Sequence, residues 1–136
     1  MADAASAHLR AADPVLGAMI ERLDAVALPD RSDRPAPGEL YASLVRTIVG
    51  QQLSVLAARA IYGRLTDRFG GRPPTPEEIL ADDPEELRAA AGLSRAKVSY
   101  LRSLAEHVIS GELELARMDE LSDEDVTTEL VAVKGL

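Results

Sequence analysis

Apolar residues recur along most of the chain at the three- and four-residue spacing of amphipathic helices. The pattern is strongest over residues 40–65, where a polar interruption, "GQQLS", separates two apolar series: Leu40, Leu44 and Ile48, then Leu56, Ala60 and Leu65. β-branched residues never alternate over the length of a strand. The pattern therefore predicts an all-α protein, a multi-helix bundle without a sheet.

Capping residues predict where these helices begin and end. Asp13-Pro14 should open a helix through about Val26, and the polar loop "LPDRSDRPAPG" should follow it. Later helices are expected over 38–50 and 54–69, from Thr75-Pro76, from Asp83-Pro84 to Gly92, from Ser94 to Gly111, and from Ser122. Residues before Asp13, including His8, are expected to fray. Length alone predicts a single domain over residues 1–136.

The stretch "IVGQQLS" places a glycine and two adjacent amides at the centre of the strongest apolar segment. A helix continued through it would turn a glutamine toward the apolar side, which costs about 1–3 kcal/mol if the amide finds no partner. We therefore expect a helix corner between Gly50 and Ser54. Its glutamines either satisfy free backbone groups at the corner or serve a function.

Composition limits the chemistry that this chain can perform. It has no cysteine, which excludes disulfides, thiolate zinc sites and cysteine nucleophiles. No apolar run is long enough to span a membrane and no signal peptide is recognised, so a cytoplasmic, nucleoid-associated protein is expected. The net charge is −8, yet arginines outnumber acids between Glu39 and Arg72: Arg46, Arg59, Arg64, Arg68 and Arg72. Solvated helix faces are the favoured explanation of these arginines, because surface helices often carry arginine for solubility.

No complete active site is visible. His8 lies near the N-terminus, and His107 lies near the end of a predicted helix, where exposure or contact with the helix dipole is expected. The carboxylates occupy capping or solvated positions, and the glycines form no phosphate-binding loop.

The chain ends in "ELVAVKGL", an apolar helix end followed by Lys-Gly-hydrophobic. This resembles the first half of a helix-hairpin-helix. With "LVRTIVGQQLSVLAARAIYGRL" and "AAGLSRAKVSYLRSLAEHVISGEL" in this order, the chain from about Asp13 to Leu136 resembles the 3-methyladenine DNA glycosylase II family, within the helix-hairpin-helix base-excision glycosylases.

The resemblance implies a hydrolase of base excision repair that flips an alkylated purine out of duplex DNA. An aspartate then supports the developing charge on the sugar while water displaces the base. In the family this aspartate follows the second hairpin helix, so it would lie beyond Leu136. The chain is thus expected to be truncated and to release no base by itself. Without their cover, Leu130 and Val133 should leave it marginal, oligomeric or prone to aggregate.

The resemblance also assigns residues. Gln52 matches the side chain that fills the stack after flipping, while Gln51 and Ser54 are expected to hold the corner. The hairpin residues Lys134, Gly135 and Leu136 should face a DNA phosphate. The carbonyls of Val131, Val133 and Leu136 match positions that hold a monovalent cation, Na⁺ or K⁺. Arg95 and Lys97 match basic positions of the family, although exposed charges at a helix start explain them equally.

Two functions remain open at this point. The first is a glycosylase whose partner is damaged double-stranded DNA, with no membrane and no small-molecule cofactor. The second is a non-catalytic helical module that binds DNA or a protein.

Overall fold

The computed structural model of the chain describes residues 2–22 and 35–136. Its described residues contain helices and no strand, so the predicted all-α class is confirmed. The contacts divide the chain into two units, Met1–Arg34 and Pro35–Leu136, and we describe each by itself. A single domain over residues 1–136 therefore stays a prediction. None of the described helices is long and apolar enough to cross a membrane.

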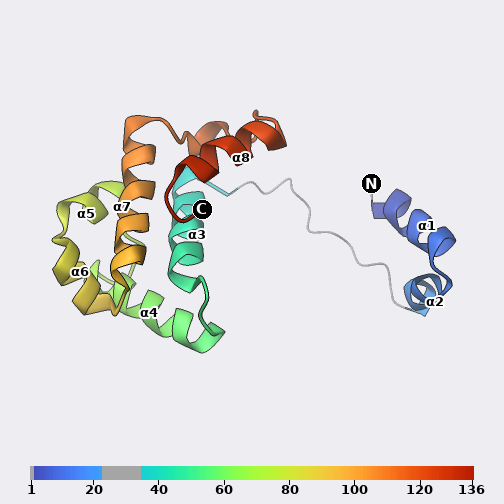
Figure 1. The fold of residues 1–136 in the computed structure, drawn as a ribbon, viewed down its shortest axis with the longest axis horizontal. Coiled ribbons are helices and arrows are strands. Elements are labelled where there is room, and N and C mark those ends of the chain that lie inside the picture. The colour runs from blue at the N-terminus through green and yellow to red at the C-terminus, as the bar shows by residue number, and fades with distance from the viewer. Residues whose placement is uncertain (1, 23–34) are drawn as a thin grey trace. The chain divides into compact units, whose positions relative to one another are not determined.

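The described helices are labelled in chain order in Figure 1. In the first unit they are α1 (Ala2–Ala12) and α2 (Pro14–Arg22). In the second they are α3 (Pro37–Gly50), α4 (Val55–Arg68), α5 (Pro76–Ala81), α6 (Pro84–Ala91), α7 (Arg95–Ser110), the 3₁₀ turn η1 (Leu115–Arg117) and α8 (Asp123–Ala132).

The second unit is built around α3 and α7, which pack side by side while α5 and α6 lie against α7 (Figure 1). The fully buried side chains of these two helices include Val45 and Ile48 on α3 and Leu101 and Leu104 on α7. Their burial at helical spacing is what the amphipathic pattern predicts, and it supplies the main apolar stabilisation of the unit.

Side-chain caps start the helices where the sequence predicts them. Thr75 and Glu78 form a reciprocal capping box on α5, and the Asp83 carboxylate accepts from the amides of Glu85 and Glu86 on α6. Ser94 and Ser122 cap α7 and α8. Each cap satisfies amides that a helix start leaves without an internal partner.

The N-terminal unit differs from the predicted pattern at its start. Residues 2–12 form α1, where fraying was expected. Helix α2 packs on it through Gly17, where a β-carbon would lie 3.1 Å from the Arg10 carbonyl oxygen. Helix α2 ends at Arg22; Val26 and most of the predicted loop lie outside the described residues.

The prediction that Leu56, Ala60 and Leu65 form one apolar face after the corner was wrong in part. Leu56 is 77 % exposed and Ala60 is also exposed, whereas Leu65 is buried as expected. The corner breaks the helical phase, so α4 buries Ile61, Tyr62 and Leu65 and does not continue the face of α3. The expectation that Val133 lacks cover was also wrong: its side chain is 1 % exposed, because the chain turns inward there onto the core.

Ion pairs hold the loop before α5. The Arg72 guanidinium donates to both carboxylate oxygens of Glu78, with Nη1 2.9 Å from Oε2. Because Arg72 stabilises the carboxylate, the pKa of Glu78 is lowered to about 2. The same carboxylate accepts from the Thr75 amide and completes the capping box.

Glu78 should make stability depend on pH. Its pKa is lower in the folded protein than its ordinary value of 4.5, so its contribution is present above about pH 4.5 and is lost as pH falls toward about 2. We expect Glu78→Gln to lower the melting temperature at pH 7 and the difference from the unsubstituted chain to shrink by pH 2–3. A difference that stays constant over this range in thermal melts would contradict the assignment.

Candidate functional site

The stretch "GQQL" forms a tight turn between α3 and α4. The Leu53 amide donates to the Gly50 carbonyl at 3.2 Å, and Gln51 has φ −53° and ψ 131°. Gln52 follows with φ +57°, the only described residue other than glycine with positive φ. These values match a type II turn, in which glycine or asparagine is preferred at the third position. Gln52 thus occupies a strained position, and its side chain is exposed.

A second turn of the same kind follows α8. The Leu136 amide donates to the Val133 carbonyl at 3.2 Å, and Gly135 has φ +88°. A β-carbon on Gly135 would overlap the Tyr100 ring at Cδ2, so the turn packs directly on that ring. Both the backbone angle and the available space therefore require glycine here.

Gln51 joins the two turns. Its Nε2 donates to the Gly135 carbonyl at 2.6 Å, a bond between residues 84 positions apart. The Lys97 ammonium donates to the carbonyls of Val49 and Gln51 at 2.7 and 2.9 Å, where α3 ends. Burial lowers the pKa of Lys97. The side-chain amide of Gln51 at the corner therefore has a hydrogen-bond partner, the Gly135 carbonyl of the second turn.

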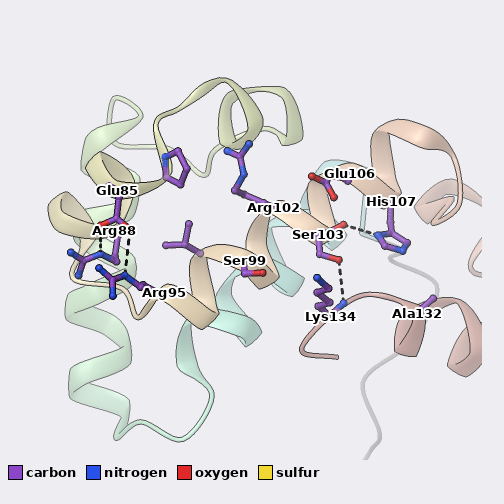
Figure 2. A pocket seen from close by; sticks show the side chains of 12 residues that line it. Glu85, Arg88, Arg95, Ser99, Arg102, Ser103, Glu106, His107, Ala132 and Lys134 are labelled. Carbon is purple, nitrogen blue, oxygen red and sulfur yellow. Dashed lines mark hydrogen bonds and ion pairs between the residues drawn. The ribbon is translucent and has the colours of Figure 1, made fainter.

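Helix α7 supports this arrangement with one face. Lys97, Tyr100 and Ser103 are three residues apart, so they lie on neighbouring turns of the helix. The Ser103 hydroxyl, which is almost fully buried, accepts from the Lys134 amide at 3.2 Å (Figure 2). Thus α7 contacts the corner through Lys97 and the second turn through Tyr100 and Ser103.

A groove of about 490 Å³ runs along α7 beside the second turn (Figure 2). Its basic residues are mostly engaged. Glu85 pairs with Arg88 at 3.0 Å and with Arg95 at 3.5 Å, and Arg102 donates to three backbone carbonyls at the end of α5. The Glu85 carboxylate therefore compensates Arg88 and Arg95, whereas Arg102 and Lys134 line the groove without an ion pair to any described residue.

The predicted residues occupy distinct places. Ser54 begins α4, where its Oγ accepts from the Ala57 amide at 3.2 Å. The Lys134 side chain is exposed, but its amide is bound by Ser103. The Gly135 amide has no hydrogen-bond partner among the described residues. Arg95 is exposed on α7, whereas Lys97 points inward.

Sequence reasoning did not find Tyr100 and Ser103, nor the inward direction of Lys97. The one available signal was their three-residue spacing on the predicted α7, next to apolar positions. Ser103 and Lys97 interrupt the buried face, and a polar residue there is expected to have a polar partner.

The described carboxylates with shifted pKa lie elsewhere. Arginine partners lower the pKa of Glu78, Asp82 and Glu85, all between α4 and α6 or on α6. Among the described residues, no carboxylate forms a hydrogen bond with the residues of the two turns. The chemistry available at the turns is therefore hydrogen bonding and positive charge.

Comparison with known proteins identifies relatives of this arrangement. The family described as HhH-GPD superfamily base excision DNA repair protein matches residues 45–134. DNA-3-methyladenine glycosylase 1 of Schizosaccharomyces pombe is 40 % identical over 100 residues, which cover 72 % of this chain and 43 % of that protein.

Two solved structures share the fold. A DNA-3-methyladenine glycosidase from Bacillus halodurans superposes with a TM-score of 0.76 at 39 % identity, covering 94 % of this chain and 56 % of that one. The Schizosaccharomyces pombe 3-methyladenine DNA glycosylase in complex with abasic DNA gives 0.75 at 33 % identity, covering 97 % and 63 %. The chain thus spans about half the length of these relatives.

The contacts between the turns should stabilise the second unit. Gln51→Ala removes the bond to Gly135 and should cost roughly 1 kcal/mol, or about 4–8 °C in melting temperature. Lys97→Met leaves two carbonyls without their donor and should cost about 1–3 kcal/mol. Thermal or denaturant melts measure both.

Arg95→Gln is the matched control, because Arg95 lies on the same helix but is exposed. It should change stability by less than about 0.5 kcal/mol. If Gln51→Ala melts like this control, the bond to Gly135 does not hold the corner.

Proposed function

We propose a function from the premise that this chain belongs to the HhH-GPD superfamily of base excision DNA repair proteins. The protein excises alkylated purines of the 3-methyladenine type from duplex DNA, as a DNA N-glycosylase that flips the damaged base out of the stack. The observation that carries this proposal is the bond from Gln51 to Gly135, because it sets the exposed Gln52 beside a glycine turn with a free amide.

Gln52 is the side chain that enters the stack. Its positive φ is unfavourable for a residue with a β-carbon, and such strain tends to persist at functional sites. Gln51 and Gln52 are adjacent, but of their two side chains only that of Gln51 forms a hydrogen bond with a described residue. A long amide at the exposed position can fill the space of a flipped base and hydrogen-bond the orphaned partner base.

The second turn binds a phosphate of the strand that carries the flipped base. Its residues are Lys134, Gly135 and Leu136, of which Gly135 keeps an unpaired amide and Lys134 an exposed ammonium. A backbone amide and a cation are common phosphate ligands. Phosphate contacts position a protein on DNA, so this turn sets where Gln52 meets the duplex.

The catalytic carboxylate lies outside residues 1–136 in this proposal. In its support, the carboxylates with lowered pKa are paired with arginines far along the chain from both turns. Residues 35–136 then recognise and open the DNA, and the charge that stabilises the sugar cation comes from elsewhere in the enzyme.

A monovalent cation held by the carbonyls of Val131, Val133 and Leu136 fits this turn. Val133 leaves the helical conformation, with φ −76° and ψ 130°, and its carbonyl accepts only the Leu136 amide. Carbonyl oxygens are ligands that hard cations prefer, and the described residues contain no cluster of three or more acidic, histidine or cysteine side chains for a metal. A bound cation would add positive charge next to the phosphate.

Gln52 should contribute to DNA binding and not to folding. Gln52→Gly relieves the positive φ, so stability should be unchanged or higher by up to about 1 kcal/mol. Affinity for abasic duplex should nevertheless fall by a few kcal/mol at most, because the unstacked site loses its filling side chain. Melting curves and binding titrations on the same protein separate the two effects.

The salt dependence supplies a control. Gln52→Gly should leave the slope of log affinity against log salt unchanged, whereas Lys134→Ala should flatten it by about one unit. Affinity for abasic duplex that survives Gln52→Gly would remove Gln52 from the stack and favour a non-catalytic helical module.

Binding of the cation should be detectable from the melting temperature, without an activity assay. Replacing K⁺ by tetramethylammonium at constant ionic strength should lower the melting temperature, because a ligand bound only to the folded state stabilises it. Gly135→Ala, which distorts the turn, should abolish this difference. Equal melting temperatures in both salts would rule out the cation.

A further inference from the structure

A second groove opens beside the corner, between α3 and α4. It has a volume of about 510 Å³, and we call it the arginine groove; its lining includes Arg46, Gly50, Leu53, Val55, Arg59 and Tyr62. Arg46 and Gly50 lie one helical turn apart on α3, as do Val55 and Arg59 on α4. The groove therefore begins at the turn that carries Gln52.

The charge of this groove is uncompensated. No carboxylate lines it, and neither Arg46 nor Arg59 forms an ion pair with any described residue. Most of the other arginines in the second unit have carboxylate partners: Arg68, Arg72, Arg88, Arg95 and Arg117. Arg64 and Arg102 instead donate to backbone carbonyls, whereas no described hydrogen bond uses the guanidinium groups of Arg46 and Arg59. In a chain of net charge −8, two free guanidinium groups in one groove favour an anionic ligand.

One of these arginines is held in place. The Arg46 guanidinium lies over the Tyr62 ring, 4.8 Å from its centroid. This contact orients the planar group without using its N–H donors, all of which remain available to an oxygen ligand. The buried Tyr62 hydroxyl has no hydrogen-bond partner among the described residues, and the contact with Arg46 is made by the face of the ring.

The remaining wall is apolar and open to solvent. Val55 is 72 % exposed and Leu53 is 39 % exposed, and both lie within three residues of Gln52. A ligand that covers them must combine an apolar face with regularly spaced negative charge. The sugar-phosphate backbone of DNA has both properties, with deoxyribose between phosphates.

We propose that the arginine groove holds the backbone beside the flipped nucleotide, with Arg46 and Arg59 on its phosphates and Leu53 and Val55 against its sugar. This inference rests on the proposed function, because it takes the duplex to be opened at Gln52. It adds a second phosphate site at the corner, in addition to the Gly135 turn. Two sites next to Gln52 would hold the strand while the base is out of the stack.

The test uses Arg46→Gln and Arg59→Gln, each measured for binding to abasic and undamaged duplex over a series of salt concentrations. Each substitution should flatten the salt slope by about 0.9 for abasic duplex, the value for one lost phosphate contact. The slope for undamaged duplex should change less, because the backbone enters the groove only when the strand is distorted. Circular dichroism and melting curves check that both variants fold.

Arg117→Gln is the matched control, since Arg117, the last residue of η1, is exposed and pairs with Glu114. It should leave both slopes unchanged. Neutral methylphosphonate groups, placed singly beside the abasic site, locate the phosphate contact. At one position the neutral group should abolish the effect of Arg59→Gln on the affinity for abasic duplex.

The outcomes separate the two proposals. If the unsubstituted chain binds abasic duplex more tightly than undamaged duplex, but both groove variants keep its slopes, the arginine groove is not a phosphate site and the proposed function stands. If the unsubstituted chain shows no preference for abasic duplex, the proposed function fails and this inference fails with it.

Discussion

The hydrogen bond from Gln51 to Gly135 is the contact on which the geometry of the site depends. It joins two tight turns that are 84 residues apart and leaves the neighbouring Gln52 exposed with positive φ. Lys97 fixes one turn by binding the last carbonyls of α3, and Ser103 fixes the other by binding the Lys134 amide. Because both residues belong to α7, one rigid helix sets the distance between the corner and the hairpin. A functional side chain is best held when its neighbours are locked by packing and hydrogen bonds.

The charged residues of the second unit are also distributed unevenly over its surface. The acidic residues of α5 and α6 neutralise the arginines beside them, while the α3–α4 face keeps two arginines free. A strongly acidic chain can therefore present a basic surface at the place where it is proposed to meet DNA. A net charge of −8 is unfavourable for binding a nucleic acid, whereas the local excess of arginines favours the proposed DNA partner.

The sequence was sufficient for the fold class and for most helix boundaries, because capping residues and proline positions act locally. Thr75, Asp83, Ser94 and Ser122 begin their helices as their types predict. It also located the corner at "GQQLS". The partner of Gln51 could not be predicted, since a bond between distant residues depends on how the helices pack. The burial of Val133 and the inward direction of Lys97 were missed for the same reason.

Site-directed cross-linking tests the central claim that Gln52 enters the opened stack. The chain contains no cysteine, so Gln52→Cys introduces a single thiol. We would mix this variant with duplex that carries a thiol-tethered base opposite an abasic site, and use Glu106→Cys, an exposed position on α7, as the control. The account predicts a disulfide with residue 52 that requires the abasic site and does not form with residue 106. Equal cross-linking at both positions, or cross-linking at residue 52 that is independent of the abasic site, would contradict it.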